Sequence, residues 1–535
     1  MRCDSYYDDM KTHAPDPLDY PHARVQSLPL HVHDLLKHAA QAHASATVTF
    51  LSPDGEVTTQ TYSQLATAVQ HRSAELQARG LRPGDALVSF GLSSLDQMTW
   101  LYGALQQGVT THLLNPQHRP EDLALFIQQI RPSLLLHDSA TADAACGLSA
   151  LFANMPLCDM SQPGITGIDA YSAPAFDEQT LSHVCYSSGT TGTPKTVAYT
   201  HRSTLLHAWS CALPDAMALS STDRVMPLMQ NFHASAWGAP FVCPLVGASM
   251  VLVPLNRDPA QWFQWIEEHK ITVLGAVSAH WLALAQYMRV HGLRFSTLRR
   301  TVVGGTRLPF EVALYIQDGL GVEVRHAWGM TETSPLATIE RFDSSNASLQ
   351  HGKPVFGIEL SVQDKQGLCV PKGTGELMAR GHWVAHYPSG NGEWLATGDF
   401  AILHDSAQLE IIDRMEDALI SNGNPLCSAL IEHQARLVPG VADAALLVTG
   451  LDNGHCVLAW IAVAESDPSA VDLALQQHIA SAFNGWCPTQ CKRVDSFPYT
   501  PSAKVQKHLL KAQIARLHNN NEALTPSFSC RGHES

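Results

Sequence analysis

The chain has 535 residues, a mass of 58.2 kDa and a formal net charge of −15, from 34 Lys and Arg against 49 Asp and Glu. This length predicts more than one domain, because single hydrophobic cores stop growing at about 250–300 residues. The acidic balance argues against a nucleic-acid partner, which needs basic surface, and 45% hydrophobic residues exclude a disordered or fibrous chain.

Targeting signals and paired cysteines are not apparent. The N-terminus is polar, and no apolar run of about 18 residues occurs, so we expect no secretory signal and no membrane span. The 12 Cys are scattered without a CxxC pair, which predicts reduced thiols in a cytoplasmic protein. His31 and His33 flank a single residue and are expected to be two surface histidines rather than a metal pair.

Strand-like and helix-like segments alternate through most of the chain. Residues 1–28 lack periodicity and are expected to form a loose lead-in, and helical spacing then begins at 30–42. Two β-branched runs precede a helix at 63–79, for which Ser63 is the expected N-cap. Further strands are expected at 85–90, 133–137, 248–254, 272–276 and 301–303. This alternation predicts a mostly parallel α/β architecture.

The pattern restarts near residue 412. A helix at 428–436, strands at 444–448 and 456–463 and a helix at 470–483 predict a small α+β domain. We therefore expect a large domain at 29–412, a small C-terminal domain at 413–518 and a disordered polar tail at 519–535.

The most informative stretch runs from Tyr186 to Lys195 and reads YSSGTTGTPK. Glycines let the backbone present N–H groups, hydroxyls add donors and Lys195 adds positive charge, a composition typical of phosphate loops. Pro194 stands where a Walker loop has its second glycine, and the strand-like 197–200 follows in place of a helix. The sequence thus predicts a phosphate loop between two strands, with an ordinary polar hairpin as the alternative.

With this loop in place, the chain resembles the adenylate-forming superfamily of acyl-CoA synthetases, peptide-synthetase adenylation domains and luciferases over about residues 30–515. It looks closest to medium- or long-chain fatty acyl-CoA ligases. The resemblance implies a large N-terminal domain of packed β-sheets and helices with a β-barrel-like subdomain, and a small, mobile α+β C-terminal domain. The other segments that carry it, in family order, are 232–233, 304–309, 326–333, 375–381, 397–399, 413–414 and 498–504.

The resemblance implies that ATP activates a carboxylic acid to an acyl-adenylate with release of pyrophosphate, and that CoA then takes the acyl group. The adenylation step brings the anionic acid and ATP together, so it requires cations and hydrogen-bond donors directed at the developing charge. The resemblance assigns Mg²⁺ to Glu332 and Ser187, and the α-phosphate to Thr331. The residues implied to hold the β- and γ-phosphates are Ser187, Ser188, Gly189, Thr190, Thr191, Gly192 and Lys195.

Further nucleotide contacts follow from the same resemblance. Trp328 would pack on adenine, Asp399 would accept the ribose hydroxyls, and Arg414 would hold ribose or phosphate. Taken alone, Trp328 could equally be a core residue and Asp399 a turn residue. The remaining positions assigned to the nucleotide are Gly305, Thr306, His326, Ala327 and Gly329.

Lys504 is the implied catalytic cation that bridges carboxylate and α-phosphate; the alternative is that Lys504 is a solvated surface lysine, and Lys507 is a nearby decoy. Rotation about a hinge at Glu416 would withdraw Lys504 and open a channel for phosphopantetheine. His233, Trp237 and Gly304 are assigned to the acid. Because His233 stands where amino-acid-activating relatives carry an aspartate, a fatty or aryl acid is expected instead of an amino acid.

Departures from the family pattern lie in the small domain: Glu416 at the hinge, Asn422, Pro425, Tyr499 and Ala503. They leave open whether CoA or the phosphopantetheine of an acyl carrier protein accepts the acyl group. An aryl-acid CoA ligase and a non-catalytic adenylate-binding protein remain as further alternatives. A homodimer is the expected oligomer if the chain associates, because two-fold symmetry is the commonest.

Overall fold

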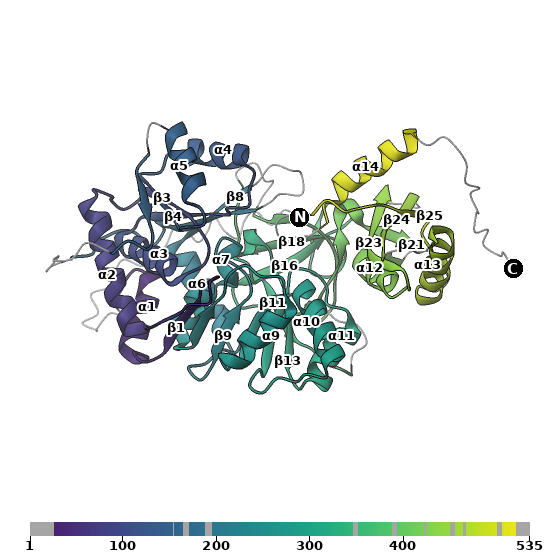
Figure 1. Cartoon of the computed structure of the whole chain (residues 1–535), viewed down its shortest axis with the longest axis horizontal. Coiled ribbons are helices and arrows are strands. Elements are labelled where there is room, and N and C mark those ends of the chain that lie inside the picture. The colour runs from purple at the N-terminus through teal and green to yellow at the C-terminus, as the bar shows by residue number, and fades with distance from the viewer. Residues whose placement is uncertain are drawn as a thin grey trace, which may run out of the picture.

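The computed structural model describes residues 26–152, 155–163, 171–187, 195–345, 351–387, 393–421, 424–449, 455–463, 467–499 and 505–520. Its largest element is a nine-stranded sheet whose central strands run parallel (Figure 1). The strands, in spatial order, are β15 (Lys353–Pro354), β14 (Thr338–Arg341), β13 (Glu323–Trp328), β12 (Arg300–Gly304), β11 (Val273–Val277), β9 (Arg224–Pro227), β10 (Ser249–Leu252), β1 (Thr47–Leu51) and β2 (Val57–Thr61).

A six-stranded sheet forms the second α/β unit. Its spatial order is β6 (Leu157–Asp159), β5 (Leu134–His137), β3 (Ala86–Phe90), β4 (Thr110–Leu114), β7 (Leu181–Ser187) and β8 (Lys195–Thr200). Only the β7–β8 pairing is antiparallel in this sheet. The predicted mostly parallel α/β architecture is therefore confirmed.

Helices separate and cover these sheets (Figure 1). One buried apolar cluster joins α1, α2, α3, α6 and α8 to β1, β9 and β10, which makes these helices the core between the two sheets. Thr61, not the expected Ser63, caps α2, because its hydroxyl and the Gln64 side chain form a reciprocal capping box. The helices of this region are α1 (His33–Ala42), α2 (Tyr62–Ala78), α3 (Leu95–Gln107), α4 (Pro120–Ile130), α5 (Ala142–Leu151), α6 (His201–Ala212), α7 (Ala234–Trp237), α8 (Ala239–Val246), α9 (Pro259–Glu268), α10 (Ser278–His291) and α11 (Phe310–Leu314), which the π-turn Tyr315–Gly319 continues.

A five-stranded antiparallel sheet corresponds to the expected barrel-like subdomain. Its order is β17 (Cys369–Val370), β16 (Ile358–Gln363), β18 (Gly373–Gly381), β19 (Leu395–Leu403) and β20 (Leu409–Arg414). Its outer strands β17 and β20 do not pair with each other within the described ranges, so the sheet stays open. Strand β20 continues past residue 412 to Arg414.

The C-terminal part is a separate α+β unit at the end of the molecule opposite α1 and α2 (Figure 1). It contains the hairpin β21–β22 (Leu419–Ser421 and Asn424–Leu426) and the sheet β23–β24–β25 (Val441–Thr449, His455–Ala462 and Gln490–Arg493). Its helices are α12 (Ser428–Arg436), α13 (Pro468–Ala482) and α14 (Lys507–Asn520). Among the described residues no helix is long and apolar enough to cross a membrane.

Candidate active site

The β7–β8 hairpin carries the predicted phosphate loop. Ser187 and Lys195 face each other as the last paired residues of the two antiparallel strands. The expectation that a strand follows the loop is confirmed, because β8 precedes α6. Ser188, Gly189, Thr190, Thr191 and Gly192 lie outside the described residues, so their phosphate-binding role stays a prediction.

A tyrosine that the sequence did not single out connects this hairpin to Glu332. The Tyr387 hydroxyl donates a 3.0 Å hydrogen bond to Glu332 Oε1, and Lys195 Nζ lies 5.7 Å from the centre of the Tyr387 ring. The Tyr199 hydroxyl on β8 donates to the Thr331 carbonyl at 2.6 Å. Burial, and then the negative charge of Glu332, raise the pKa of Tyr387, which therefore stays protonated as a donor.

Glu332 fits the role of a divalent-cation ligand. Its residue is only 5% exposed and belongs to a short helical turn, Thr331–Thr333, directly after β13. A buried carboxylate is a costly group unless it is paired or binds a cation. The carboxylate oxygens of Glu332 are of the kind that Mg²⁺ prefers, and the assignment of Mg²⁺ to Glu332 and Ser187 stays a prediction.

Trp328 and Asp399 lie in direct contact across two sheets. The Trp328 indole Nε1 donates a 2.9 Å hydrogen bond to Asp399 Oδ2. Arg414, the cross-strand partner of Asp399 in β20, pairs with Oδ1 at 3.1 Å. Trp328 and Arg414 thus both bond to the buried carboxylate of Asp399. The three residues predicted for one nucleoside site lie together, although they are far apart in sequence.

Glycines are required at the ends of β12 and β13, because other parts of the backbone approach these positions closely. A Cβ at Gly329 would lie 1.3 Å from the Pro335 carbonyl oxygen, and a Cβ at Gly304 would lie 3.3 Å from the Ala327 carbonyl oxygen. Gly305 has φ +87°, a conformation that L side chains rarely adopt. These glycines therefore form a tightly packed backbone surface at the carboxyl ends of the parallel strands, where ligands of open α/β sheets bind.

Two further predicted residues stabilise this surface. His326 is buried, and its Nε2 donates to the Thr306 carbonyl at 3.5 Å. Its ring also packs on His351, with centroids 4.6 Å apart. Burial lowers the pKa of His351 well below its ordinary value, so that ring is neutral.

An apolar cavity of about 30 Å³ begins under Trp237. A Cβ at Gly304 would lie 3.2 Å from Cη2 of Trp237, so the missing side chain leaves room for the indole. The other walls are apolar side chains that include Met217, Leu219 and Met229. His233 lies four residues before Trp237, and its ring packs edge-on against Phe232 with centroids 4.7 Å apart.

Lys504 lies outside the described residues, and its catalytic role stays a prediction. The chain on both sides is ordered, because Tyr499 and Val505 form an isolated β-bridge. Lys507, the nearby decoy in the sequence, has a side chain that is only 17% exposed. It donates to Glu432 and Ser428, each at 2.9 Å.

The surrounding carboxylates favour the protonated, positively charged form of Lys507. Burial disfavours this form, but the negative charges of Glu432, Asp413 and Asp417 outweigh the effect of burial and raise the Lys507 pKa. Asp417 also pairs with Lys511 of α14 at 2.9 Å. The predicted hinge residue Glu416 lies beside Asp417 in the short helical turn Met415–Asp417. Helix α14 is therefore held to this turn by the ion pair between Lys511 and Asp417, while the role of Glu416 as a hinge stays a prediction.

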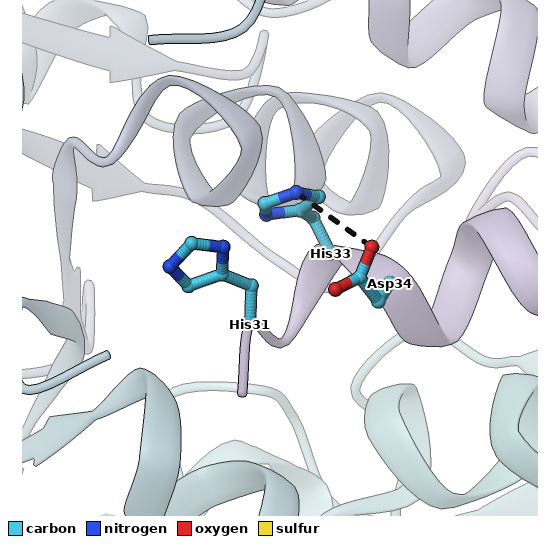
Figure 2. Close-up of side chains that lie close together, drawn as sticks. All are labelled: His31, His33 and Asp34. Atoms are coloured by element: carbon cyan, nitrogen blue, oxygen red, sulfur yellow. Dashed lines mark ion pairs between the residues drawn. The ribbon is translucent and has the colours of Figure 1, made fainter. Parts of the chain in front are cut away.

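The residues His31, His33 and Asp34 form a cluster of possible metal donors at the start of α1 (Figure 2). The expectation of two surface histidines is wrong for His31, which is 9% exposed and stacks on Phe176 with centroids 4.2 Å apart. His31 Nε2 donates to the Phe176 carbonyl at 3.1 Å, and His33 Nε2 lies 4.0 Å from Asp34. Aromatic packing accounts for this arrangement.

Comparison with known proteins assigns the family. The AMP-binding enzyme model matches residues 36–387. A 3-methylmercaptopropionyl-CoA ligase of Ruegeria lacuscaerulensis is 30% identical over 532 residues, with 92% of this chain and 98% of that protein covered. A medium-chain-fatty-acid–CoA ligase of Ectopseudomonas oleovorans is 29% identical and covers 89% and 94%.

A solved structure, an anthranilate CoA ligase in complex with anthranoyl-AMP, has the same fold. It superimposes with a TM-score of 0.80 at 21% identity and covers 93% of this chain and 99% of that one. The chain therefore belongs to the AMP-binding enzyme family, within the adenylate-forming superfamily, and is an AMP-forming acid–thiol ligase.

Proposed function

We propose that this enzyme converts an apolar aliphatic carboxylic acid, ATP and CoA into an acyl-CoA, AMP and pyrophosphate. The observation that carries the proposal is the apolar cavity that Trp237 lines. Trp237 lies against Gly304 at the end of β12, the strand that pairs with β13, and β13 carries Trp328 and leads to Glu332. Because every lining side chain is apolar, a second carboxylate or a hydroxyl on the acid would be buried there without a partner.

The nucleotide would lie along the carboxyl ends of β12 and β13. In this arrangement Asp399 accepts the ribose hydroxyls, Trp328 packs on adenine, and Lys195 with the hairpin loop receives the β- and γ-phosphates. Mg²⁺ held by Glu332 and Ser187 would supply charge neutralisation there. Lys504 would approach from the C-terminal unit and bridge the acid and the α-phosphate.

The cavity size favours short or medium tails over long ones. A volume of about 10–15 Å³ by the same measure holds one water-sized group, so a cavity of about 30 Å³ accepts a short apolar chain. The two named relatives act on 3-methylmercaptopropionate and on medium-chain fatty acids, both acids with unbranched apolar tails. A medium-chain fatty acid stays within the proposed class, whereas a long-chain acid requires the cavity to enlarge.

Pyrophosphate release across a panel of acids, with and without CoA, tests the proposal. We expect release with straight-chain and thioether monocarboxylic acids, little with aryl or dicarboxylic acids, and thioester formation when CoA is present. Release without acyl-CoA would redirect the second step to a carrier-protein phosphopantetheine. No release with any acid would leave an adenylate-binding protein without activity.

The division into two half-reactions has its own check. The K504A variant should lose acid-dependent pyrophosphate release while it still forms acyl-CoA from supplied acyl-adenylate. Equal loss of both activities would contradict the assignment of Lys504 to the first step.

A further inference from the structure

One face of strand β12 borders the cavity. Arg300, Val302 and Gly304 share this face, because side chains alternate along a strand. Gly304 lies under Trp237, Val302 lines the cavity, and Arg300 lies beyond it. At ~3.3 Å per residue, Arg300 lies ~13 Å below Gly304.

Two neighbouring strands extend the same face. Val273 pairs with Val225, and Gly275 pairs with both Pro227 and Val302. All of these residues line the cavity. The cavity therefore runs along the sheet surface, from the carboxyl ends of the strands toward their amino ends.

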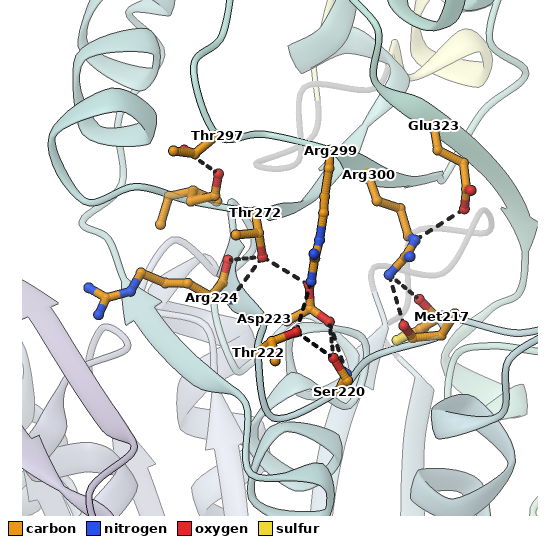
Figure 3. A network of polar contacts seen from close by, with 12 residues as sticks. Met217, Ser220, Thr222, Asp223, Arg224, Thr272, Thr297, Arg299, Arg300 and Glu323 are labelled. Carbon is orange, nitrogen blue, oxygen red and sulfur yellow. Dashed lines mark hydrogen bonds and ion pairs between the residues drawn. The ribbon is translucent and has the colours of Figure 1, made fainter.

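The amino ends are covered by the loop between α6 and β9, whose Met217 and Leu219 point into the cavity wall. Two arginines, Arg300 and Arg325, bond to the backbone of this loop, and Figure 3 shows Arg300 between Met217 and Glu323. Arg300 Nη1 donates to the carbonyls of Ala218 at 2.8 Å and Met217 at 3.5 Å. Arg325 Nη1 donates to the carbonyl of Pro214 at 2.6 Å and to that of Ala216.

Glu323 on β13 aligns both guanidinium groups. Its Oε1 accepts from Arg300 Nε at 3.1 Å and from Arg325 Nε at 2.7 Å. Burial disfavours the charge of Glu323, but the hydrogen bond from Arg325 and the nearby arginines outweigh this cost and lower its pKa. Glu323 therefore remains a carboxylate that holds both arginines against the loop.

The end of the loop is held separately. Asp223 accepts from the Ser220 backbone N–H at 2.9 Å, and its other oxygen accepts from Thr272 Oγ1 at 2.9 Å and from Arg299 at 2.7 Å. Hydrogen bonds to charged side chains thus hold the Met217–Leu219 segment on both sides, which opposes its displacement by a tail that presses on it.

We propose that residues 214–219 form the end wall of the acyl cavity and that Arg300, Arg325 and Glu323 set the length of the accepted tail by holding this wall from outside. This inference rests on the proposed function, in which the acid tail occupies the cavity. The three charged residues are positioning residues, because they act through Met217 and Leu219.

The test compares kcat/KM for straight-chain monocarboxylic acids of increasing length, with CoA-dependent pyrophosphate release as the readout. M217A removes part of the wall, and we expect the ratio of kcat/KM for long to short acids to rise about tenfold or more, since one methylene changes discrimination by about 10–200-fold. L219F adds volume and should shift the optimum to shorter acids. R300M should broaden the profile, because the wall is no longer held.

Arg341 supplies the matched control. It pairs with the other oxygen of Glu323 at 3.5 Å, and within the described residues it reaches none of the loop carbonyls. R341M should therefore keep the wild-type length profile. Thermal unfolding of each variant checks folding, and the ratio between two acids measured on one preparation does not depend on the active fraction.

The outcomes separate the two levels of the proposal. Unchanged length ratios in both M217A and R300M, with wild-type activity on at least one acid, would overturn the end wall alone. A broadened profile in R341M equal to that of R300M would also overturn it. No pyrophosphate release by the wild-type enzyme with any acid would overturn the proposed function and the end wall with it.

Discussion

The Trp328 indole donates a 2.9 Å hydrogen bond to Asp399, and this bond links the carboxyl end of β13 to β19 of the five-stranded sheet. Arg414 holds the other oxygen of the same carboxylate. The side chain proposed for adenine therefore orients the side chain proposed for ribose. Loss of either should affect the binding of the whole nucleoside.

Replacement of Trp328 by Phe keeps an aromatic ring but removes the donor to Asp399. Hydrogen bonds to charged groups contribute about 1.5–3 kcal/mol, so we expect the KM for ATP to rise by about tenfold or more. The KM for the acid should change little. Steady-state pyrophosphate release at varied ATP measures this, and an unchanged KM for ATP in W328F would show that the bond does not orient the ribose site.

Replacement of Tyr387 by Phe removes the hydroxyl that donates to Glu332. The ring that lies near Lys195 is retained. We expect the Mg²⁺ concentration for half-maximal adenylation to increase several-fold, because the carboxylate loses the group that orients it. Magnesium titrations of Y387F and wild type check this. Y171F is the control, since Tyr171 bonds to Gln107 in another part of the fold.

Replacement of Lys507 by Met should destabilise the C-terminal unit. Removal of one partner from a buried charge cluster typically costs about 3–5 kcal/mol, and here Glu432 and Asp413 would lose their cation. Urea unfolding followed by tryptophan fluorescence measures the effect, because Trp460 is buried in β24. The exposed pair Lys372–Asp405 provides the control, and K372M should leave the transition unchanged.

Acid should destabilise the fold already below neutral pH, through its buried histidines. Burial lowers the pKa of His207 and His183 to about 3 and that of His112 to about 4. The unfolded chain binds a proton at each of these rings near pH 6.5, whereas the folded chain does not. Stability is therefore fully present above pH 6.5 and falls as pH drops, by up to about 1.4 kcal/mol per pH unit for each histidine.

The urea concentration at the midpoint of unfolding, measured between pH 7.5 and 5, gives the change of stability with pH. H207Q should reduce the slope relative to wild type, while H71N, at an exposed position, should not. A slope that is flat over this range would contradict the presence of neutral buried histidines.

The parts of the site that depend on local sequence were predictable. A glycine- and threonine-rich loop between two strand-like segments predicted a loop that joins two strands, and the structure has β7 and β8 on its two sides. Helix α12 and strand β1 begin and end where the periodicity of the sequence places them. Such secondary structure depends on residues that are close in sequence, because the spacing of apolar residues and the residue types in turns determine it.

The contacts that join distant strands were not predictable. Tyr387 lies 55 residues after Glu332, and Arg325 reaches the carbonyl of Pro214 across 111 residues. The ion pairs of Lys507 could not be predicted because the carboxylates that act on it come from β20, from α12 and from the turn between them. The alternation of Arg300, Val302 and Gly304 was visible in the sequence, but only strand pairing shows that this face continues into Glu323 and Arg325.

The cavity under Trp237 also bears on the order of events during turnover. If the acid tail occupies this cavity as proposed, Met217 and Leu219 close its inner end, and the tail would enter past Trp237. A nucleotide bound at the carboxyl ends of the strands would lie across that entrance. In the proposed arrangement the acid would therefore enter before ATP, and the order of binding would follow from the position of the entrance and not from the relative affinities of the two substrates.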